Sequence, residues 1–194
     1  MLARVAKLPS KVSSSRVNLT AANNIYGLAS LLCNITIASQ NCNSLNISTT
    51  CPKQLKKIYS IAELGTDIIF LSDLRLNDNP NLIRDIENSF LACSKKPYIF
   101  FHNSTKNSRG TGILIAQNIE ISIINEFKDP NENILGLHVT LRGKEMLLLS
   151  IYGPNNNHLD CETLFFECLD DVLSELHDIP VICGGDWNCT LIIM

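Results

Sequence analysis

The sequence predicts an α/β fold in which helices cover the outside of a mixed sheet. A strand–helix–strand pattern runs from residue 34 to residue 71, and several further strands follow before the next clear helix. This order of elements is typical of mixed sheets that carry helices on their outer faces. The chain has 194 residues, of which 45% are hydrophobic and 18% charged, which is the composition of a folded protein with a core.

In the first half of the domain, hydrophobic spacing separates strands from helices. Residues 34–40 (NITIASQ) alternate and are β-branched, which predicts a strand. Pro52 begins a helix with apolar residues at helical spacing, and Gly65 ends it. Residues 67–71 (DIIFL) are almost all apolar and predict a short strand buried on both faces. A weaker helix is expected over residues 81–90.

The second half of the domain is richer in strands. Strands are predicted, in order, over residues 98–101, 112–116, 120–125, 134–141 and 145–152. Asp160 is expected to cap the clearest helix, whose apolar stripe runs from Leu164 to Leu176. A last buried strand over residues 179–183 ends in Gly184-Gly185-Asp186, where the two glycines would let the chain turn sharply.

Domain organisation follows from composition. Residues 1–30 are expected to form an unstructured leader, and residues 31–194 the domain. No acid occurs before Glu63, and the Ser-rich leader carries Arg4 and Arg16, so a mitochondrial transit peptide stays open as an alternative. No apolar run approaches the roughly 18 residues of a membrane span, and we expect no membrane association.

Net charge and cysteine spacing limit the classes of function. The formal net charge of −3 gives no overall electrostatic argument for nucleic-acid binding. The eight cysteines include no C-x-x-C spacing, so neither a zinc ribbon nor a thioredoxin-type dithiol is indicated. We expect free thiols in a reducing compartment.

Polar side chains gather where the predicted strands end. They are Asn41 and Asn43 after the first strand, Asp73 after the second, Tyr152 and Asn155 after a later one, and Asp186, Trp187 and Asn188 after the last. Ligands of open α/β sheets bind at strand ends, although Asn and Asp are also the commonest turn residues. Asp186 and Asn188 would point the same way from an extended segment. Trp187 would either pack in the core or contact a base or sugar.

Five segments of the chain resemble ordered motifs of one superfamily. They are SQNCNSL (39–45), DIIFLSDLR (67–75), GTGILI (110–115), SIYGPN (150–155) and GGDWN (184–188). Together they resemble the endonuclease/exonuclease/phosphatase superfamily, and are most similar to the apurinic-type endonuclease domain of non-LTR (LINE-like) retrotransposons. The resemblance covers residues 35–190 and implies a four-layer α/β/β/α sandwich. The family's final strands and last motif lie beyond residue 194, so the domain is expected to be C-terminally truncated.

The resemblance implies a metal and phosphate site. Asn41 would help to hold the metal ion and the phosphate, and Asn43 would occupy a neighbouring phosphate-binding position. Asp73 stands where the family usually has a metal-binding Glu, and its carboxylate reaches about one methylene less. The implied cofactor is Mg²⁺ or Mn²⁺, because hard cations with oxygen ligands neutralise charge on a phosphodiester.

The resemblance also implies catalytic residues. Asp186 would orient or activate the attacking water, and Asn188 would help to stabilise the pentacoordinate transition state. Tyr152 and Asn155 would contact or orient the scissile phosphate. Uncharged donors of this kind supply fixed dipoles without repelling the phosphate.

The expected function is metal-dependent phosphodiester hydrolysis, as a DNA-nicking endonuclease domain of a retrotransposon-derived protein. The family's C-terminal Ser-Asp-His motif is not in the sequence, so whether the chain is an active enzyme stays open. One alternative is a non-catalytic retroelement relic or binding protein. Another keeps the superfamily but changes the substrate to RNA, inositol phosphates or sphingomyelin. A complete and active retroelement protein would work in the nucleus.

Overall fold

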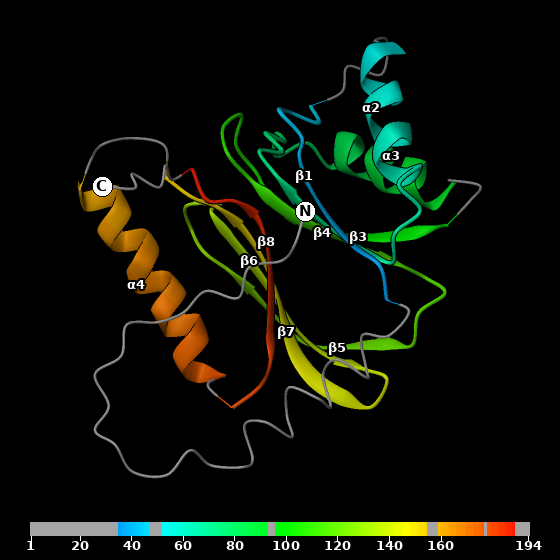
Figure 1. The fold of residues 1–194 in the computed structure, drawn as a ribbon. Helices are drawn as coiled ribbons and strands as arrows, with labels where there is room; N and C mark the ends of the chain where they lie inside the picture. Colours follow the sequence, from blue (N-terminus) through cyan, green and yellow to red (C-terminus); the bar gives the residue numbers. More distant parts are fainter. Residues whose placement is uncertain (1–34, 47–51, 93–95, 155–158, 177, 189–194) are drawn as a thin grey trace, which may run out of the picture. The chain divides into compact units, whose positions relative to one another are not determined.

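The computed structural model describes residues 35–46, 52–92, 96–154, 159–176 and 178–188 (Figure 1). Its elements are β1 (Ile37–Asn41), α2 (Pro52–Ala62), β2 (Ile68–Ser72), α3 (Pro80–Leu91), β3 (Tyr98–Asn103), β4 (Thr111–Ala116), β5 (Ile121–Lys128), β6 (Ile134–Leu141), β7 (Lys144–Tyr152), α4 (Leu159–Glu175) and β8 (Val181–Asp186). None of the helices within these residues is long and apolar enough to cross a membrane. The predicted leader lies outside the described residues.

The strands form two four-stranded sheets. The first has the order β1-β2-β4-β3, and the second has the order β5-β6-β7-β8. In each sheet one pairing is parallel, β1 with β2 and β7 with β8, and the other pairings are antiparallel. Both sheets are therefore mixed, as the strand–helix–strand pattern predicts.

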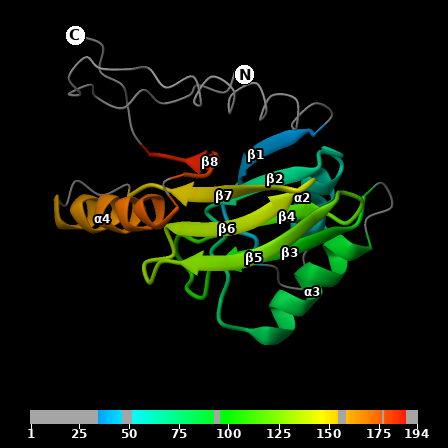
Figure 2. The same cartoon turned by 90° about the horizontal axis from the view of Figure 1, so that it is seen from below.

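The two sheets pack face to face, with helices on their outer sides. Helices α2 and α3 cover the first sheet and α4 covers the second (Figures 1 and 2). Between the sheets, the hydroxyl of Ser150 on β7 donates to the carbonyl oxygen of Leu71 on β2 at 2.9 Å in a buried hydrogen bond. The predicted α/β/β/α sandwich is confirmed.

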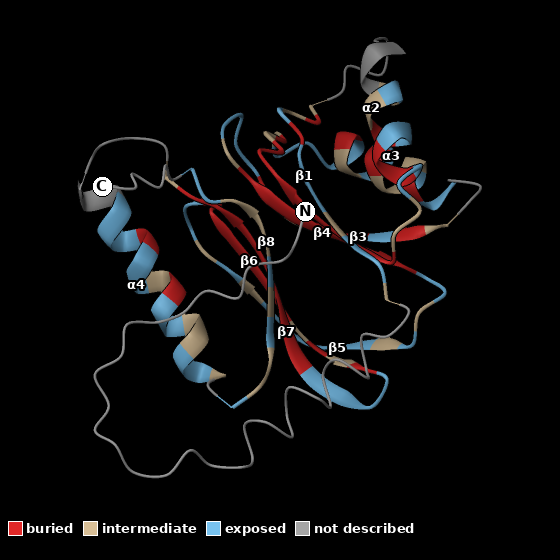
Figure 3. Ribbon diagram, viewed as in Figure 1, coloured by how far each residue is buried: buried red, intermediate tan, exposed pale blue. Residues whose placement is uncertain are grey.

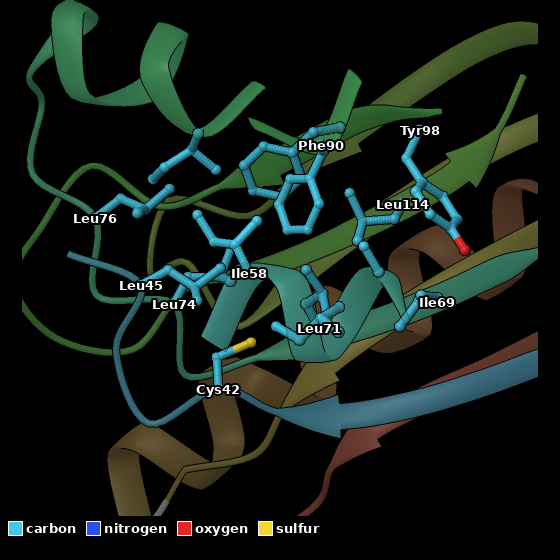
Figure 4. Packing of buried hydrophobic residues seen from close by; sticks show 14 of the residues in the cluster. Cys42, Leu45, Ile58, Ile69, Leu71, Leu74, Leu76, Phe90, Tyr98 and Leu114 are labelled. Carbon is cyan, nitrogen blue, oxygen red and sulfur yellow. The ribbon is translucent and has the colours of Figure 1, made fainter. Parts of the chain in front are cut away.

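In the described part of the chain, the apolar core under α2 and α3 is larger than the apolar cluster under α4. On α3, Leu82, Ile86 and Phe90 are buried at helical spacing, and the side chain of Asn79 caps the helix by accepting from two backbone N–H groups. These side chains meet apolar residues of β2, β3, β4 and α2 (Figure 4). The buried stripe makes this weakly predicted helix stable, because tertiary packing supplies most helical stability.

Helix α4 packs on the second sheet through a narrower stripe than the sequence predicts. Phe165 and Leu169 are buried against β6 and β7, but Leu164 is 50% exposed. The expectation that Leu164 belongs to the stripe is therefore wrong. The helix also begins at Leu159, so Asp160 lies inside its first turn and does not precede it as a cap.

The last strand differs most from its prediction. β8 was expected to cover residues 179–183 and to be buried, but it runs from Val181 to Asp186, and Val181 and Cys183 are exposed (Figure 3). Within the described residues β8 pairs only with β7, so it is an edge strand. The apolar sequence of a strand does not reveal which place in the sheet it takes.

The first strand begins later than predicted for a local reason. The backbone N–H and the hydroxyl of Thr36 both donate to one carboxylate oxygen of Asp67, each at 2.8 Å. Lys96 donates to the other oxygen at 2.7 Å. Because Thr36 bonds this side chain, strand β1 starts only at Ile37.

Candidate active site

Two rows of residues meet at one end of the sandwich. In the first sheet, Asn41 lies opposite Ser72 and Ser72 lies opposite Thr111. In the second sheet, Tyr152 lies opposite Asp186. The rows are joined where the side-chain amide of Asn41 donates to a carboxylate oxygen of Asp186 at 2.8 Å. The structure thus brings together two predicted site residues that are 145 positions apart in the sequence.

The two glycines before Asp186 have another role than the predicted turn. Gly184 and Gly185 pair with β7 as part of strand β8. A Cβ on Gly184 would lie 2.5 Å from the ring of Phe70, and a Cβ on Gly185, whose φ is +137°, would overlap the carbonyl oxygen of Ile151. The glycines allow this close approach of the sheets and of the backbone, and the strand carries Asp186 to the end of the sandwich.

Asp186 and Asn188 are linked by a turn and not by an extended segment. The backbone N–H of Asn188, whose φ is +47°, donates to the second carboxylate oxygen of Asp186 at 3.0 Å. The side-chain amide of Asn188 donates to the carbonyl oxygen of Gly153 at 2.6 Å. The prediction that both side chains point the same way from a strand is therefore wrong, although both residues lie at the site.

Asn43 supports the site through its backbone. Its N–H donates to the side-chain oxygen of Asn41 at 3.0 Å, and its carbonyl oxygen accepts from the ammonium of Lys57 at 3.0 Å. The side-chain oxygen of Asn41 therefore accepts from Asn43 and its side-chain nitrogen donates to Asp186, so both polar atoms of this amide are held. A cavity of about 140 Å³ adjoins these residues and is lined by Gln40, Asn41, Cys42, Lys57, Ser60 and Ile61.

Asp73 is held by an arginine. Its carboxylate is 4% exposed, and the guanidinium of Arg75 donates to both oxygens, each at 2.8 Å. The hydrogen bonds and charge of Asp73 raise the pKa of Arg75, and Tyr152 acts in the same direction. A buried carboxylate requires such a counter-charge, and a bidentate guanidinium is the strongest form that one side chain offers.

The donor set fits a divalent metal ion only in part. Asn41 and Asp186 offer the hard oxygen atoms that Mg²⁺ prefers. Asp73 fits less well as a ligand in this arrangement, because its carboxylate is buried and its charge is already balanced by Arg75. Within the described part of the chain, no group of three or more His, Cys, Asp or Glu residues could hold a metal.

Several polar residues at this end escape prediction from sequence. The hydroxyls of Ser72 and Thr111 are buried, and within the described structure neither has a hydrogen-bond partner. Arg109 donates to the side-chain oxygen of Asn133 at 3.2 Å, and the carbonyl oxygen of Asn133 accepts the N–H of Tyr152 at 2.8 Å. Arg75 stands two residues after Asp73, which was a usable signal. Nothing local distinguishes Arg109 or Asn133.

Tyr152, Trp187 and Asn155 complete the predicted set. Tyr152 is buried at the end of β7, beside Arg75. Trp187 is 42% exposed, and its ring lies edge to face against that of Phe165 on α4, with 6.4 Å between the ring centroids. It therefore packs on the helix that covers the outer face of the second sheet. Asn155 lies outside the described residues, and its role stays a prediction.

No protein-family model matches this sequence, and no curated protein matches it either. Solved structures do share the fold. A protein from Bacteroides thetaiotaomicron described as an endonuclease/exonuclease/phosphatase family protein has a TM-score of 0.56 and 14% identity, over 79% of this chain and 63% of that one. The chain has the endonuclease/exonuclease/phosphatase fold.

Two further structures with this fold were solved with DNA. TDP2 from D. rerio, in complex with a single-strand DNA product, has a TM-score of 0.52 and 18% identity, over 81% of this chain and 62% of that one. The 3′ phosphatase NExo from Neisseria, bound to a product DNA hairpin, has a TM-score of 0.50 and 17% identity, over 79% and 58%. This chain spans less than two thirds of each of these proteins. At such identities the likeness is one of fold.

Proposed function

We propose that this end of the sandwich hydrolyses phosphodiester bonds of DNA. The observation that carries the proposal is the 2.8 Å hydrogen bond between Asn41 and Asp186, which assembles a carboxylate and an amide from different sheets. Asn188 and Tyr152 lie beside this pair. Neutral donors beside the carboxylate can contact the phosphodiester without adding further negative charge that would repel it.

Each residue has a role that its contacts allow. Asp186 accepts from Asn41 and from the backbone N–H of Asn188, so its carboxylate is oriented and could hold or deprotonate a water molecule. Asn41 is exposed at the end of β1, where its amide can also meet the substrate. Asn188 is fixed by its bond to Gly153 and adds a second amide.

A divalent ion, Mg²⁺ or Mn²⁺, is part of the proposal. It would be held by oxygens of Asn41 and Asp186 and would neutralise charge that develops on the phosphate. Asn41 and Asn188 would orient the substrate, and Asp186 would take the proton from the attacking water.

The DNA-nicking and retrotransposon assignments rest on two supports. The strings SIYGPN and GGDWN resemble those of LINE-like endonucleases. Two proteins with the same fold were solved with DNA, which makes DNA the first substrate to test. We propose on these grounds a DNA-nicking endonuclease domain derived from a retrotransposon.

A second candidate is nucleic-acid binding without catalysis. The observation that favours it is the Asp73–Arg75 pair, because the position at which the family resemblance implies a metal-binding acid is neutralised by a cation. In that case the chain would bind DNA and leave it intact.

A plasmid-nicking assay on the purified chain separates the two. We expect nicking of supercoiled DNA that requires Mg²⁺ or Mn²⁺ and falls about 10²–10⁴-fold in Asp186→Asn, as for loss of a general base. Asp170→Asn, which changes an exposed acid on α4, is the matched control and should nick like the unaltered chain. Binding of the plasmid without metal-dependent nicking would favour the second candidate. A labelled RNA of the same sequence tests the alternative substrate.

A further inference from the structure

Two arginines stand on neighbouring loops at the candidate active site. Arg75 follows β2 and Arg109 precedes β4, and these strands are antiparallel neighbours. Beyond the last ladder pair, the N–H of Leu74 donates to the carbonyl oxygen of Gly110 at 3.1 Å, and that of Arg75 to the carbonyl oxygen of Arg109 at 2.7 Å. The backbone therefore holds the two arginines side by side.

Both arginines adopt a backbone conformation that residues with a side chain rarely take. The φ angles of Arg75 and Arg109 are +50° and +64°. Left-handed conformations of such residues are strained and cluster where function requires a side chain in a particular place. A glycine at either position would relieve the strain but would remove the guanidinium.

Both side chains are anchored around Tyr152. The guanidinium of Arg75 is fixed by Asp73 and also interacts with Tyr152. Arg109 is fixed by the side-chain oxygen of Asn133. The backbone carbonyl oxygen of the same residue accepts the backbone N–H of Tyr152. Arg75 therefore interacts with Tyr152 directly, and Arg109 is linked to Tyr152 through Asn133.

The charges of the two arginines are balanced unequally. Asp73 compensates Arg75, whose side chain is still 42% exposed. Arg109 is half-buried and bonds a neutral amide, and no ion pair to it occurs within the described residues. A guanidinium has five N–H donors, so each arginine keeps donors that its protein contacts do not use. Two fixed cations with spare donors form a binding site for an anion.

We propose that Arg75 and Arg109 bind a backbone phosphate of the nucleic acid beside the reacting one, and that Asp73 is a positioning residue for Arg75 and not a metal ligand. This inference rests on the proposed function, because it names contacts to the same substrate. It also accounts for the poor fit of Asp73 to a divalent ion, since a buried carboxylate paired with a guanidinium has its charge already balanced.

Fluorescence anisotropy with a short labelled DNA duplex, in EDTA, tests the anion site. We expect Arg109→Gln to weaken binding roughly tenfold at low salt and to reduce the salt dependence by about one phosphate contact. Arg84→Gln is the matched control, because Arg84 on α3 also bonds an asparagine oxygen, that of Asn81 at 3.0 Å, but lies on the outer side of the first sheet. Equal affinities of the two variants would overturn the proposal.

Two further variants test the role of Asp73. Arg75→Lys keeps a cation opposite Asp73 but loses the two parallel hydrogen bonds of the guanidinium. It should lower DNA affinity several-fold while the chain stays folded. Asp73→Asn should lower DNA affinity as well and leave the affinity for Mn²⁺, measured by calorimetry without DNA, unchanged. Loss of Mn²⁺ binding in Asp73→Asn would show that Asp73 is a metal ligand after all.

The outcomes separate this inference from the proposed function. If Arg109→Gln binds DNA as tightly as the unaltered chain while nicking still depends on Asp186, the anion site is wrong and hydrolysis stands. If no condition produces nicking but Arg109→Gln loses affinity, the chain binds nucleic acid through the anion site without cleaving it.

Discussion

Strands β2 and β8 are alike in sequence and differ in surroundings. Each is a short, mainly apolar segment beside an acid of the candidate site, and each was predicted to be a buried strand. All five residues of β2 are buried, whereas every residue of β8 is exposed or half-buried (Figure 3). β2 lies between β1 and β4, while β8 pairs only with β7 in the part of the chain described. An apolar run predicts a strand, but the sheet order decides its burial.

The acids at the two strand ends differ in the same way. Asp73 is buried and needs the charge of Arg75, whereas Asp186 is half-buried and is held by neutral N–H donors. A paired buried carboxylate suits a positioning role, because breaking the pair is costly. A carboxylate held by amides and open to solvent can still meet a substrate. This difference is what separates the two proposed roles.

The largest effect is expected from truncating the buried strand. Leu71→Ala removes a fully buried side chain from the core under α2 and α3 and should lower the free energy of unfolding by about 3 kcal/mol. Val181→Ala, at a residue that is 40% exposed on β8, should lower it by less than about 1 kcal/mol. Urea denaturation of both variants measures the contrast, and similar losses would mean that β8 is as well covered as β2.

A smaller loss is expected where β8 approaches β7. Gly185→Ala places a Cβ against the carbonyl oxygen of Ile151 at a positive φ, and should destabilise the fold by about 2–3 kcal/mol. Gly143→Ala is the matched control, because its φ is also positive, at +79°, but nothing lies within 4 Å of its Cβ. The excess loss in Gly185→Ala, read from urea curves, isolates the close contact. No excess would refute the account of the glycine pair.

The two acids should respond differently to loss of a partner. Arg75→Gln leaves the buried Asp73 carboxylate without its counter-charge and should cost about 2 kcal/mol, less than for a fully buried pair because Arg75 is partly exposed. Asp186→Asn should cost only about 1 kcal/mol, because the amide oxygen can still accept one of the two hydrogen bonds and the side chain is only half-buried. Thermal unfolding of both variants and of Arg75→Gln/Asp73→Asn checks this. The double variant should recover part of the loss.

The smallest effect concerns pH and Asp67. Burial acts to raise the pKa of Asp67, but hydrogen bonds from Lys96 and Thr36 outweigh burial and hold the pKa below its ordinary value of 3.8. A carboxyl whose pKa is lower in the folded state than in the unfolded state stabilises the protein fully at pH values above the unfolded-state pKa. This stabilisation is lost as the pH falls through the folded-state pKa. Asp67→Asn should therefore be less stable at pH 6, with a difference that shrinks below about pH 4. Urea midpoints across pH 3–7 test it.

Hydrophobic spacing was sufficient for most of the fold. The strand over residues 67–71, the helix from Pro52 and the strand ending at Tyr152 were found within one or two residues, because burial imposes periodicity on sequence. The exposed side of β8 was missed, because neighbours that are distant in sequence determine it. Leu164 was wrongly assigned to the buried stripe for a related reason, since an apolar residue can lie next to such a stripe in the helix without contacting the sheet.

The candidate site was only partly predictable. Asn41 and Asp186 were both predicted as site residues, yet their contact depends on how two sheets dock and is not encoded in either motif. The turn at Asn188 was missed, because Asp186 bonds its own downstream backbone and so competes with the strand. Arg109 was missed, because only the alignment of β2 with β4 places it beside Arg75.

The bond between Asn41 and Asp186 has a consequence for the order of folding. It joins edge strands of different sheets across 145 positions of sequence, so loop-closure entropy opposes it until both sheets have docked. Each sheet could collapse with its helices while the site does not yet exist. Competence for the proposed chemistry would then arise at a late, cooperative step, and it would be lost at the first separation of the sheets, before the helices unwind.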